Sequence, residues 1–323
     1  MKKLLLMYGR SRPSQEHLQR LADLGPEVVV ASTKVIALAQ CAEADAFIGT
    51  RYLQPCLPEA DNLHWVQSLV AGVNNLASPV LFEKASVVTR APIFSDVIAI
   101  HAVSMAFAVI RRLPEAARMQ EKEAWKRAHV ELLPAPKTAL ILGLGMIGRE
   151  IAAILKNLGI YVRAMDRSRT AEKENAVDQL ITDDSWRKVL PDSDLCFVTL
   201  PLTKETTQLV DLPLLHALPR HAVLVNVSRG KLVDTQALMQ LLEAGELGGA
   251  ALDVTDPQPP PEGHPLWHTP RLLITPHMAS FTPQRQERIE RFVEAQVQRF
   301  MNGEPLLYGV DLQQLEADAL GGS

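Results

Sequence analysis

Cysteine, surplus charge and long apolar runs are all scarce in this sequence. The three cysteines, Cys41, Cys56 and Cys196, are an odd number at wide and irregular spacing, which argues against a disulfide framework or a zinc site and favours a reducing compartment. Lysine and arginine are scattered and the net charge is -4, so charge gives no reason to expect binding to nucleic acid or to an anionic membrane. No cluster of His, Asp and Glu has metal-ligand spacing, and we expect no metal site.

Apolar runs are also too short for a membrane span, which needs roughly 18 residues. The segment Met1–Tyr8 begins with lysines at positions 2 and 3 and then turns apolar, as a signal peptide does. Its apolar run ends after about five residues, whereas a signal peptide needs about 7–15. We interpret this segment as a buried first strand and expect a cytoplasmic protein with no nucleic-acid or membrane partner.

The composition supports an ordinary hydrophobic core. The 323 residues, of which 47% are hydrophobic and 22% charged, favour two domains over one. Short apolar runs alternate with amphipathic segments such as 15–24 and 35–42, and this alternation predicts an α/β fold with parallel sheets covered by helices. The strands expected in the first hundred residues are 4–7, 28–31, 46–48, 66–69 and 87–89.

A second strand–helix series begins after the proline-containing segment Leu133–Pro136. A long apolar helix over 97–113 and a charged, helix-prone stretch over 115–127 precede it, a final helix over 283–301 follows it, and the last residues, 321–323, are expected to fray. We therefore expect two sheet-containing units joined by two long helices, with a ligand in the cleft between them. The predicted units are 1–97 plus 285–323, and 98–284. The strands expected in the second series are 138–142, 161–165, 195–200, 222–226, 249–253 and 272–275.

The second series opens with a glycine pattern between a strand and a helix. Gly143 permits a tight turn, Gly145 lets the backbone approach a pyrophosphate, and Gly148 lets the helix pack close to the strand. The helix begins at Met146 and Ile147, so free backbone N–H groups and the positive helix end face bound phosphates. Such a pattern can also be a ligand-free turn. The surrounding strand and helix favour dinucleotide binding.

The end of the next strand indicates which dinucleotide binds. Asp166 lies 18 residues after Gly148, near the spacing of about 20 expected for a carboxylate on the adenosine ribose. Its charge would repel a 2′-phosphate, which favours NAD(H). Arg167, Ser168 and Arg169 follow at once and could instead form a phosphate site or a solvated turn. NAD(H) is the preferred interpretation, and NADP(H) stays open.

Three further strand ends carry candidates for the reaction itself. Reduction of a 2-oxo acid needs a cation for the carboxylate and ketone, a proton donor near neutral pH, and a group that orients that donor. Arg229, His277 and Gln258 suit these roles, and each follows a predicted strand. Each alone could be an ordinary surface or loop residue. Their order downstream of the glycine pattern favours catalysis.

With these motifs the sequence resembles the D-isomer-specific 2-hydroxyacid dehydrogenase family, and most closely its glyoxylate/hydroxypyruvate reductase branch. The resemblance implies two flavodoxin- or Rossmann-like domains, the first binding substrate and the second the dinucleotide, joined by two hinge helices. It also implies a small 2-oxo or 2-hydroxy acid as substrate, a D-hydroxy acid as product, and a homodimer formed through the cofactor domain. The segments that carry it are Leu63–Val73, Pro201–Thr206, Asn226–Gly230, Leu252–Val254 and Thr275–His277.

The resemblance also implies roles for individual residues. Arg229 would bind substrate, and His277 would act as acid in reduction and as base in oxidation. Asp253 would accept a hydrogen bond from the nicotinamide carboxamide. Two short segments would complete the site: Val70, Ala71 and Gly72 offering N–H groups to the substrate carboxylate, and Thr199, Leu200 and Pro201 lining the nicotinamide side.

The sequence departs from the family pattern where Gln258 replaces the usual Glu. An amide can hydrogen-bond His277 but brings no charge, so protonation of the imidazole should be less favoured than in relatives. Formate dehydrogenases share Gln here, but the Asn typical of them is missing from Pro92–Asp96. Ile100 stands where relatives often have Glu. The other function kept open is a non-enzymatic, NAD(H)-sensing interaction module of the same fold.

Overall fold

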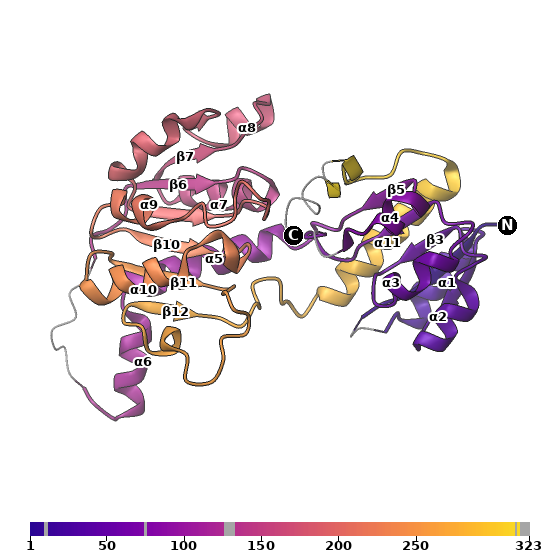
Figure 1. Ribbon diagram of the computed structural model, residues 1–323, viewed down its shortest axis with the longest axis horizontal. Coiled ribbons are helices and arrows are strands. Elements are labelled where there is room, and N and C mark those ends of the chain that lie inside the picture. The colour runs from indigo at the N-terminus through magenta and orange to yellow at the C-terminus, as the bar shows by residue number, and fades with distance from the viewer. Residues whose placement is uncertain (10–11, 74–75, 126–132, 314, 317–323) are drawn as a thin grey trace. The chain divides into compact units, whose positions relative to one another are not determined.

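The computed structural model describes residues 1–9, 12–73, 76–125, 133–313 and 315–316, so the predicted fraying of 321–323 lies outside the described residues. The chain divides into two compact units. Unit 1 comprises Met1–Ile93 and the chain from Thr282 onward, and unit 2 comprises Phe94–Phe281. Each unit has one parallel sheet with helices around it, which confirms the predicted α/β class (Figure 1).

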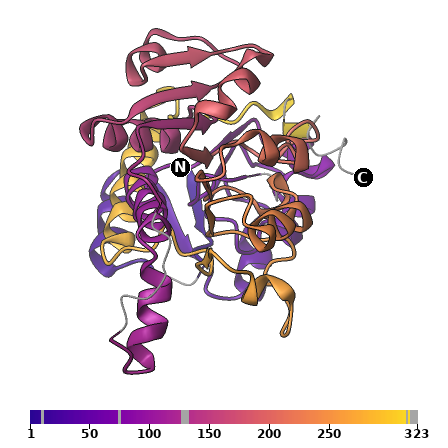
Figure 2. The ribbon, with the colours of Figure 1, turned by 90° about the vertical axis from the view of Figure 1, so that its left-hand side faces the viewer.

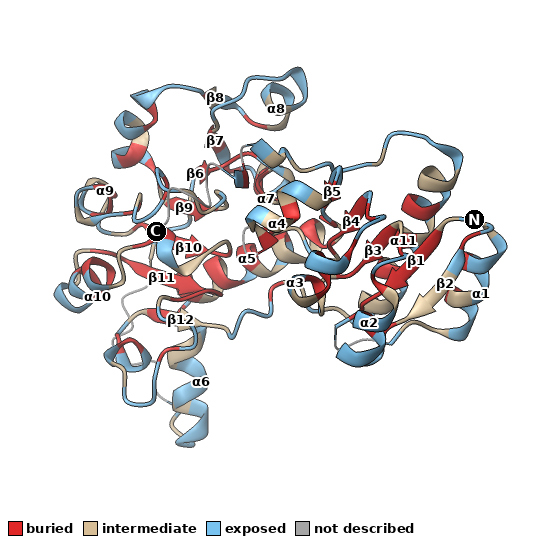
Figure 3. Ribbon diagram, turned by 45° about the vertical axis from the view of Figure 1, so that its right-hand side comes forward, coloured by how far each residue is buried: buried red, intermediate tan, exposed pale blue. Residues whose placement is uncertain are grey.

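Unit 1 is built on a five-stranded sheet of order β2-β1-β3-β4-β5. The apolar run near the N-terminus is β1, whose four residues are all buried, as predicted (Figure 3). Helices α2, α3 and α4 contribute the side chains that pack on one face of the sheet. The strands are β1 Lys3–Leu6, β2 Glu27–Val30, β3 Ala46–Ile48, β4 Trp65–Gln67 and β5 Val87–Thr89. The helices are α1 Gln15–Asp23, α2 Lys34–Gln40, α3 Leu53–Cys56, η1 Leu57–Glu59, α4 Pro79–Lys84 and α11 Arg285–Asn302.

Local capping explains where several helices of unit 1 begin. The hydroxyl groups of Ser14, Thr33 and Ser78 accept hydrogen bonds from backbone N–H groups three residues later, at the starts of α1, α2 and α4. Helix α11 ends at Gly303, which adopts the left-handed conformation that suits glycine.

Unit 2 contains a seven-stranded parallel sheet of order β12-β11-β10-β9-β6-β7-β8, in which the chain order reverses next to β6. Ligands of such sheets bind outside the carboxyl ends of the strands near this reversal. The strands are β6 Thr138–Leu142, β7 Tyr161–Met165, β8 Gln179–Ile181, β9 Leu195–Val198, β10 Val223–Asn226, β11 Gly249–Leu252 and β12 Leu272–Ile274.

Helices cover both faces of this sheet. Helices α5 and α7 pack on one face, and α9, α10 and η3 on the other. Helix α6 has no buried residue and projects from the unit (Figure 2). The helices are α5 Ser95–Ile110, α6 Leu113–Glu121, α7 Met146–Asn157, α8 Ala171–Ala176, η3 Asp184–Asp192, α9 Leu212–Ala217, η4 Gly230–Leu232, α10 Thr235–Ala244 and η5 Pro265–His268.

Helix α5 is shorter than predicted because the chain turns at Arg112, which adopts a left-handed conformation. In the part of the chain that is described, no single helix is long and apolar enough to cross a membrane. One pair bent by 69°, Ser95–Ile110 with Leu113–Glu121, passes that test only when taken together.

Candidate active site

The glycine turn lies between β6 and α7. Gly143 has a φ of +99°, and a side chain there would meet the backbone of Leu200 at 3.0 Å. A side chain at Gly148 would lie 2.3 Å from the carbonyl oxygen of Gly143. Gly145 is exposed, and a Cβ there would have no atom within 4 Å. The turn is therefore tight on its inner side and open at the start of the helix, where Met146 and Ile147 follow.

Asp166 follows β7 beside this turn. Its Oδ2 accepts the backbone N–H of Leu144 at 2.9 Å, and its Oδ1 accepts Ser168 N–H at 2.9 Å and Lys173 Nζ at 2.6 Å. Burial alone would raise the pKa of Asp166, but these hydrogen bonds outweigh it and hold the pKa below its usual value. The sequence analysis missed Lys173, whose ammonium compensates the charge of the carboxylate.

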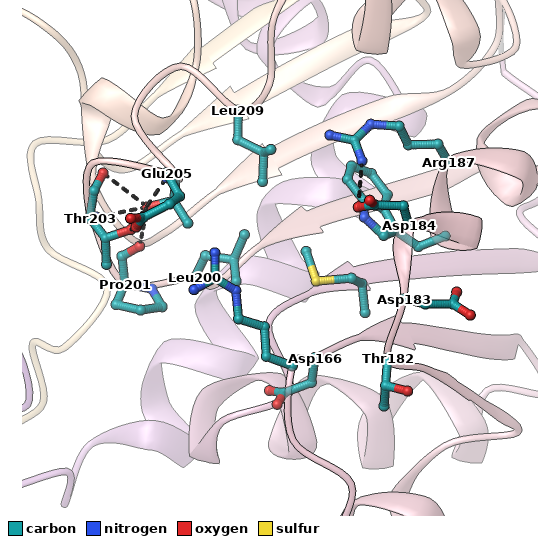
Figure 4. Close-up of a pocket in the computed structure, with 14 residues that line it drawn as sticks. Asp166, Thr182, Asp183, Asp184, Arg187, Leu200, Pro201, Thr203, Glu205 and Leu209 are labelled. Atoms are coloured by element: carbon teal, nitrogen blue, oxygen red, sulfur yellow. Dashed lines mark hydrogen bonds and ion pairs between the residues drawn. The ribbon is translucent and has the colours of Figure 1, made fainter. Parts of the chain in front are cut away.

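A cavity of about 580 Å³ opens beside Asp166 at the carboxyl ends of β7 and β9. Figure 4 shows Pro201, Thr203 and Glu205 on one side of it and Asp183, Asp184 and Arg187 on the other. This volume is typical of small-molecule and cofactor sites. Of the predicted site residues, the cavity brings together Asp166, Arg167, Leu200 and Pro201.

Thr199 connects the cavity to the glycine turn. Its hydroxyl donates to the carbonyl oxygen of Gly143 at 2.6 Å, and its backbone N–H donates to Leu142 at 2.9 Å. Ser168 and Arg169 are exposed, and Arg169 is paired with Glu174. Arg169 is therefore already neutralised, whereas Arg167 lies at the cavity.

Arg229 stands in the turn after β10. The amide of Asn226 organises this turn, because its Nδ2 donates to the carbonyl of Arg229 at 2.8 Å and its Oδ1 accepts from Ser228 N–H at 3.0 Å. The guanidinium donates to the carbonyl of Ser228 at 2.8 Å, and burial lowers the pKa of Arg229. Gly230 is required here, since a Cβ would lie 1.9 Å from the carbonyl oxygen of Thr255.

Gln258 and His277 are in direct contact although 19 residues separate them. The amide Nε2 of Gln258 donates to Nδ1 of His277 at 2.8 Å, and its Oε1 accepts from Thr255 N–H at 3.4 Å. An Nδ1 that accepts carries no proton, so the proton of the neutral imidazole is on Nε2. Both side chains are exposed. The imidazole is thus oriented and accessible, as a proton donor must be.

Asp253 follows β11 and is almost completely buried. Its Oδ1 accepts from Thr275 Oγ1 at 2.6 Å and Met278 N–H at 2.9 Å, and its Oδ2 accepts from Ala279 N–H at 3.0 Å. Burial alone would raise the pKa of Asp253, but hydrogen bonds from His101, Thr275 and these N–H groups hold the pKa below its usual value. Most of the acceptor capacity of this carboxylate is used inside the protein.

These turns form one site at the carboxyl ends of β10, β11 and β12. The backbone N–H of Asp253 donates to Asn226 at 3.0 Å, and the N–H of His277 donates to the carbonyl of Asp253 at 2.9 Å. The Arg229 turn and the His277 turn are therefore both tied to Asp253. In a comparison with protein-family models, residues 103–279 match the D-isomer specific 2-hydroxyacid dehydrogenase, NAD binding domain. The chain belongs to the D-isomer-specific 2-hydroxyacid dehydrogenase family.

Relatives within the family include a glyoxylate reductase of Thermofilum pendens, 30% identical over 76% of this chain and 74% of its own length. A D-3-phosphoglycerate dehydrogenase of Archaeoglobus fulgidus is 30% identical over 80% of this chain, which spans 49% of that protein. Among solved structures, a D-isomer specific 2-hydroxyacid dehydrogenase of Xanthobacter autotrophicus Py2 in complex with NADPH and MES has a TM-score of 0.77 and 28% identity. That alignment covers 97% of this chain and 99% of the other.

The segment that resembles the family's substrate loop lies in unit 1, directly after β4. The carbonyl of Val70 accepts from Ala91 N–H at 3.0 Å, and its N–H donates to Ser68 Oγ at 3.3 Å. Within the described part of the chain, the N–H groups of Ala71 and Gly72 donate to no protein acceptor. They are therefore available to an anion.

His101, on α5, contacts two residues of this site and was not among the residues predicted from the sequence. Its Nε2 lies 3.1 Å from Thr275 Oγ1 and 3.6 Å from Asp253 Oδ1. No local pattern marks it, because its partners are more than 150 residues away in the sequence. Among the described residues, no group of three or more His, Cys, Asp or Glu side chains could hold a metal ion.

The glycine turn gives a paired test of packing. Replacing Gly148 by alanine forces a Cβ against the Gly143 carbonyl, so we expect the free energy of unfolding to fall by about 1–3 kcal/mol. Gly145→Ala is the control, because its Cβ meets open space. Denaturant unfolding of both variants measures the difference, and equal stability of the two would contradict this account.

Proposed function

We propose that this chain is an NAD(P)H-dependent reductase of a small 2-oxo acid such as glyoxylate or hydroxypyruvate, with the D-2-hydroxy acid as product. The observation that carries the proposal is the joining of three turns at Asp253. Backbone hydrogen bonds at Asp253 tie the turn that carries Arg229 to the turn that carries His277, and the Gln258 amide orients the imidazole of His277. Membership of the family supports this reaction class.

The residues divide the chemistry between them. Arg229 binds the substrate carboxylate and polarises the ketone, and partial burial strengthens that attraction because water screens it less. In unit 1, Ala71 and Gly72 would offer backbone N–H groups to a carboxylate, whereas the Val70 N–H already donates to Ser68 Oγ at 3.3 Å. The nicotinamide supplies the hydride. As the imidazolium, His277 would donate the Nε2 proton to the new hydroxyl group, with Gln258 presenting its amide oxygen to Nδ1–H. The neutral ring, whose Nδ1 accepts from the Gln258 amide nitrogen, is the form that removes a proton in the oxidation direction.

The cofactor has a matching set of groups in unit 2. The open turn at Gly145 and the first N–H groups of α7, at Met146 and Ile147, suit a pyrophosphate. The cavity beside Asp166 suits the adenosine, with Leu200 and Pro201 as its walls. Thr199 and Asp253 would then lie toward the nicotinamide.

We further propose that NAD(H) is preferred to NADP(H), because the Asp166 carboxylate would accept ribose hydroxyls and repel a 2′-phosphate. Asp166→Ala should move the ratio of kcat/KM for NADH to that for NADPH toward NADPH by roughly 10- to 100-fold, as expected for losing hydrogen bonds to a charged group. Initial rates with both coenzymes measure the ratio. A ratio that does not change would remove Asp166 from the specificity site, and Asp183→Ala is a control on the opposite wall of the cavity.

The amide at position 258 should set the pH dependence of reduction. A carboxylate in its place would favour the imidazolium form of His277, which is the form that donates the proton. In Gln258→Glu, the decline of kcat with rising pH should therefore begin about one pH unit higher than in the wild type. Gln258→Ala removes the orienting contact without adding charge and serves as the control. Identical pH profiles for wild type and Gln258→Glu would refute the role of Gln258.

A substrate panel tests the proposed function. NADH and NADPH are each combined with glyoxylate, hydroxypyruvate, pyruvate and longer 2-oxo acids, and coenzyme oxidation is followed by absorbance. We expect the highest kcat/KM with glyoxylate or hydroxypyruvate. Tight coenzyme binding with no turnover on any of these acids would favour the non-enzymatic, NAD(H)-sensing module instead. We also expect a homodimer formed through unit 2. The molar mass in solution tests whether the chain is a dimer.

A further inference from the structure

The turn that carries His277 has an unusual backbone. His277 has a φ of +51°, a left-handed conformation that residues other than glycine rarely adopt. Such a conformation persists only where surrounding interactions hold it. The exposed imidazole is hydrogen-bonded to Gln258, whose side chain is also exposed. A hydrogen bond between two exposed side chains does not by itself fix the backbone conformation of His277.

Asp253 supplies the interactions that hold the turn. Its carbonyl oxygen accepts the N–H of His277 at 2.9 Å, and its carboxylate accepts the N–H groups of Met278 at 2.9 Å and Ala279 at 3.0 Å. Three consecutive N–H groups of the turn therefore point to one residue. The Asp253 carboxylate therefore holds the two residues directly after His277, whereas backbone carbonyl oxygens of Asp253 and Thr275 hold the His277 N–H itself.

The Asp253 carboxylate is in turn held from helix α5. The hydroxyl of Thr275 donates its single proton to Asp253 Oδ1 at 2.6 Å, so it must accept the hydrogen bond from His101 Nε2 at 3.1 Å. The same Nε2 lies 3.6 Å from Asp253 Oδ1. His101 is on a helix that packs against β11 and β12, the strands that precede Asp253 and Thr275. His101 therefore connects helix α5 to Thr275 and Asp253, which hold the turn after His277.

We propose that His101 is a positioning residue for His277, acting through Thr275 and Asp253. The inference rests on the proposed function only for its catalytic consequence, because the hydrogen bonds that carry it are structural. Removal of the His101 donor frees the Thr275 hydroxyl to rotate away from Asp253, and the N–H groups of Met278 and Ala279 lose their fixed carboxylate acceptor.

The test compares His101→Leu, which deletes the donor, with His101→Gln, whose amide nitrogen can replace Nε2. Hydrogen–deuterium exchange of the Met278 and Ala279 amides, which donate to the Asp253 carboxylate, reports the turn without requiring turnover. We expect faster exchange and a kcat about tenfold lower in His101→Leu. His101→Gln should restore both toward the wild type. Thr275→Val interrupts the same chain at its next link, so the double variant with His101→Leu should be no slower than Thr275→Val alone.

The outcomes separate this inference from the proposed function. Two results would overturn the positioning role. The first is a wild-type exchange rate in folded His101→Leu and Thr275→Val, whatever happens to kcat. The second is a double variant whose loss of kcat equals the product of the losses in the two single variants. If His101→Leu does not fold, His101→Gln and Thr275→Val decide by the same two readouts. Faster exchange combined with a wild type that reduces no 2-oxo acid would overturn the proposed function and support the positioning role.

Discussion

Replacing His277 by asparagine is expected to lower kcat for 2-oxo acid reduction by roughly 10²- to 10⁴-fold, the usual contribution of a general acid. Asparagine keeps a polar group in the exposed turn but cannot deliver a proton from the Nε2 position. Coenzyme binding should stay at its wild-type level, because the glycine turn and the cavity beside Asp166 do not involve His277. The measurement is kcat under saturating substrate, together with a fluorescence titration of NADH.

A second histidine provides the control for this experiment. His268 is an exposed residue of unit 2 at the end of η5, away from the turns that meet at Asp253. His268→Asn should leave kcat unchanged. A His277→Asn variant that retains more than a tenth of wild-type kcat would show that the proton comes from elsewhere.

Replacing Arg229 by methionine should have the next largest effect. Methionine keeps much of the side-chain volume but removes the charge and all donors, so the substrate carboxylate would lose two hydrogen bonds to a charged group. At about 1.5–3 kcal/mol each, the expected fall in kcat/KM is roughly 10²- to 10⁴-fold. Since Arg229 is proposed to contact substrate and not coenzyme, KM for NADH should change little.

Arg229→Lys separates charge from geometry. Lysine keeps a positive charge but lacks the planar fork that matches a carboxylate, and burial that lowers the pKa of Arg229 would also disfavour a charged ammonium there. We expect its kcat/KM to lie between wild type and Arg229→Met. The exposed Arg220 gives a control variant, Arg220→Met, with wild-type kinetics. Equal kcat/KM in Arg229→Met and wild type would exclude Arg229 from substrate binding.

Much of the fold could be predicted because several strands of unit 2, such as β9 and β10, are short and mostly apolar runs, as expected of a parallel sheet that helices cover on both faces. Strands 138–142 and 161–165 were predicted with their observed bounds, whereas β8 was missed. Gln179–Ile181 has only three residues and lies at the sheet edge, so it carries little of that signal. The end of β9 was predicted two residues too late and the end of β11 one residue too late. In both places the chain runs on into the turn without a glycine or proline that would mark the end of the strand.

The candidate site was predictable where its chemistry is local. The glycine spacing, Asp166 and the order of Arg229, Gln258 and His277 can all be recognised in the linear sequence. Lys173 and His101 were missed for a physical reason. Each acts through a contact that folding creates, Lys173 from the first turn of α8 to the carboxylate after β7 and His101 from a helix far from its partners in the sequence. No residue type or spacing marks such partners in advance.

Asp253 has a second role that the structure reveals. The sequence suggested a ligand of the nicotinamide carboxamide, a role that stays a proposal. The structure adds three hydrogen bonds from Thr275, Met278 and Ala279 to its carboxylate. Asp253 is therefore also the residue that joins the turns, which a one-dimensional pattern does not reveal.

Transfer of a deuterium label tests the central claim most directly. The enzyme would be given hydroxypyruvate and NADH that carries deuterium at the transferred position of the nicotinamide, and the product would be analysed for label and configuration. The account predicts D-glycerate with one deuterium at C2 for each NADH oxidised. Glycerate of the opposite configuration, label lost to water, or NADH that stays unoxidised while bound would contradict it.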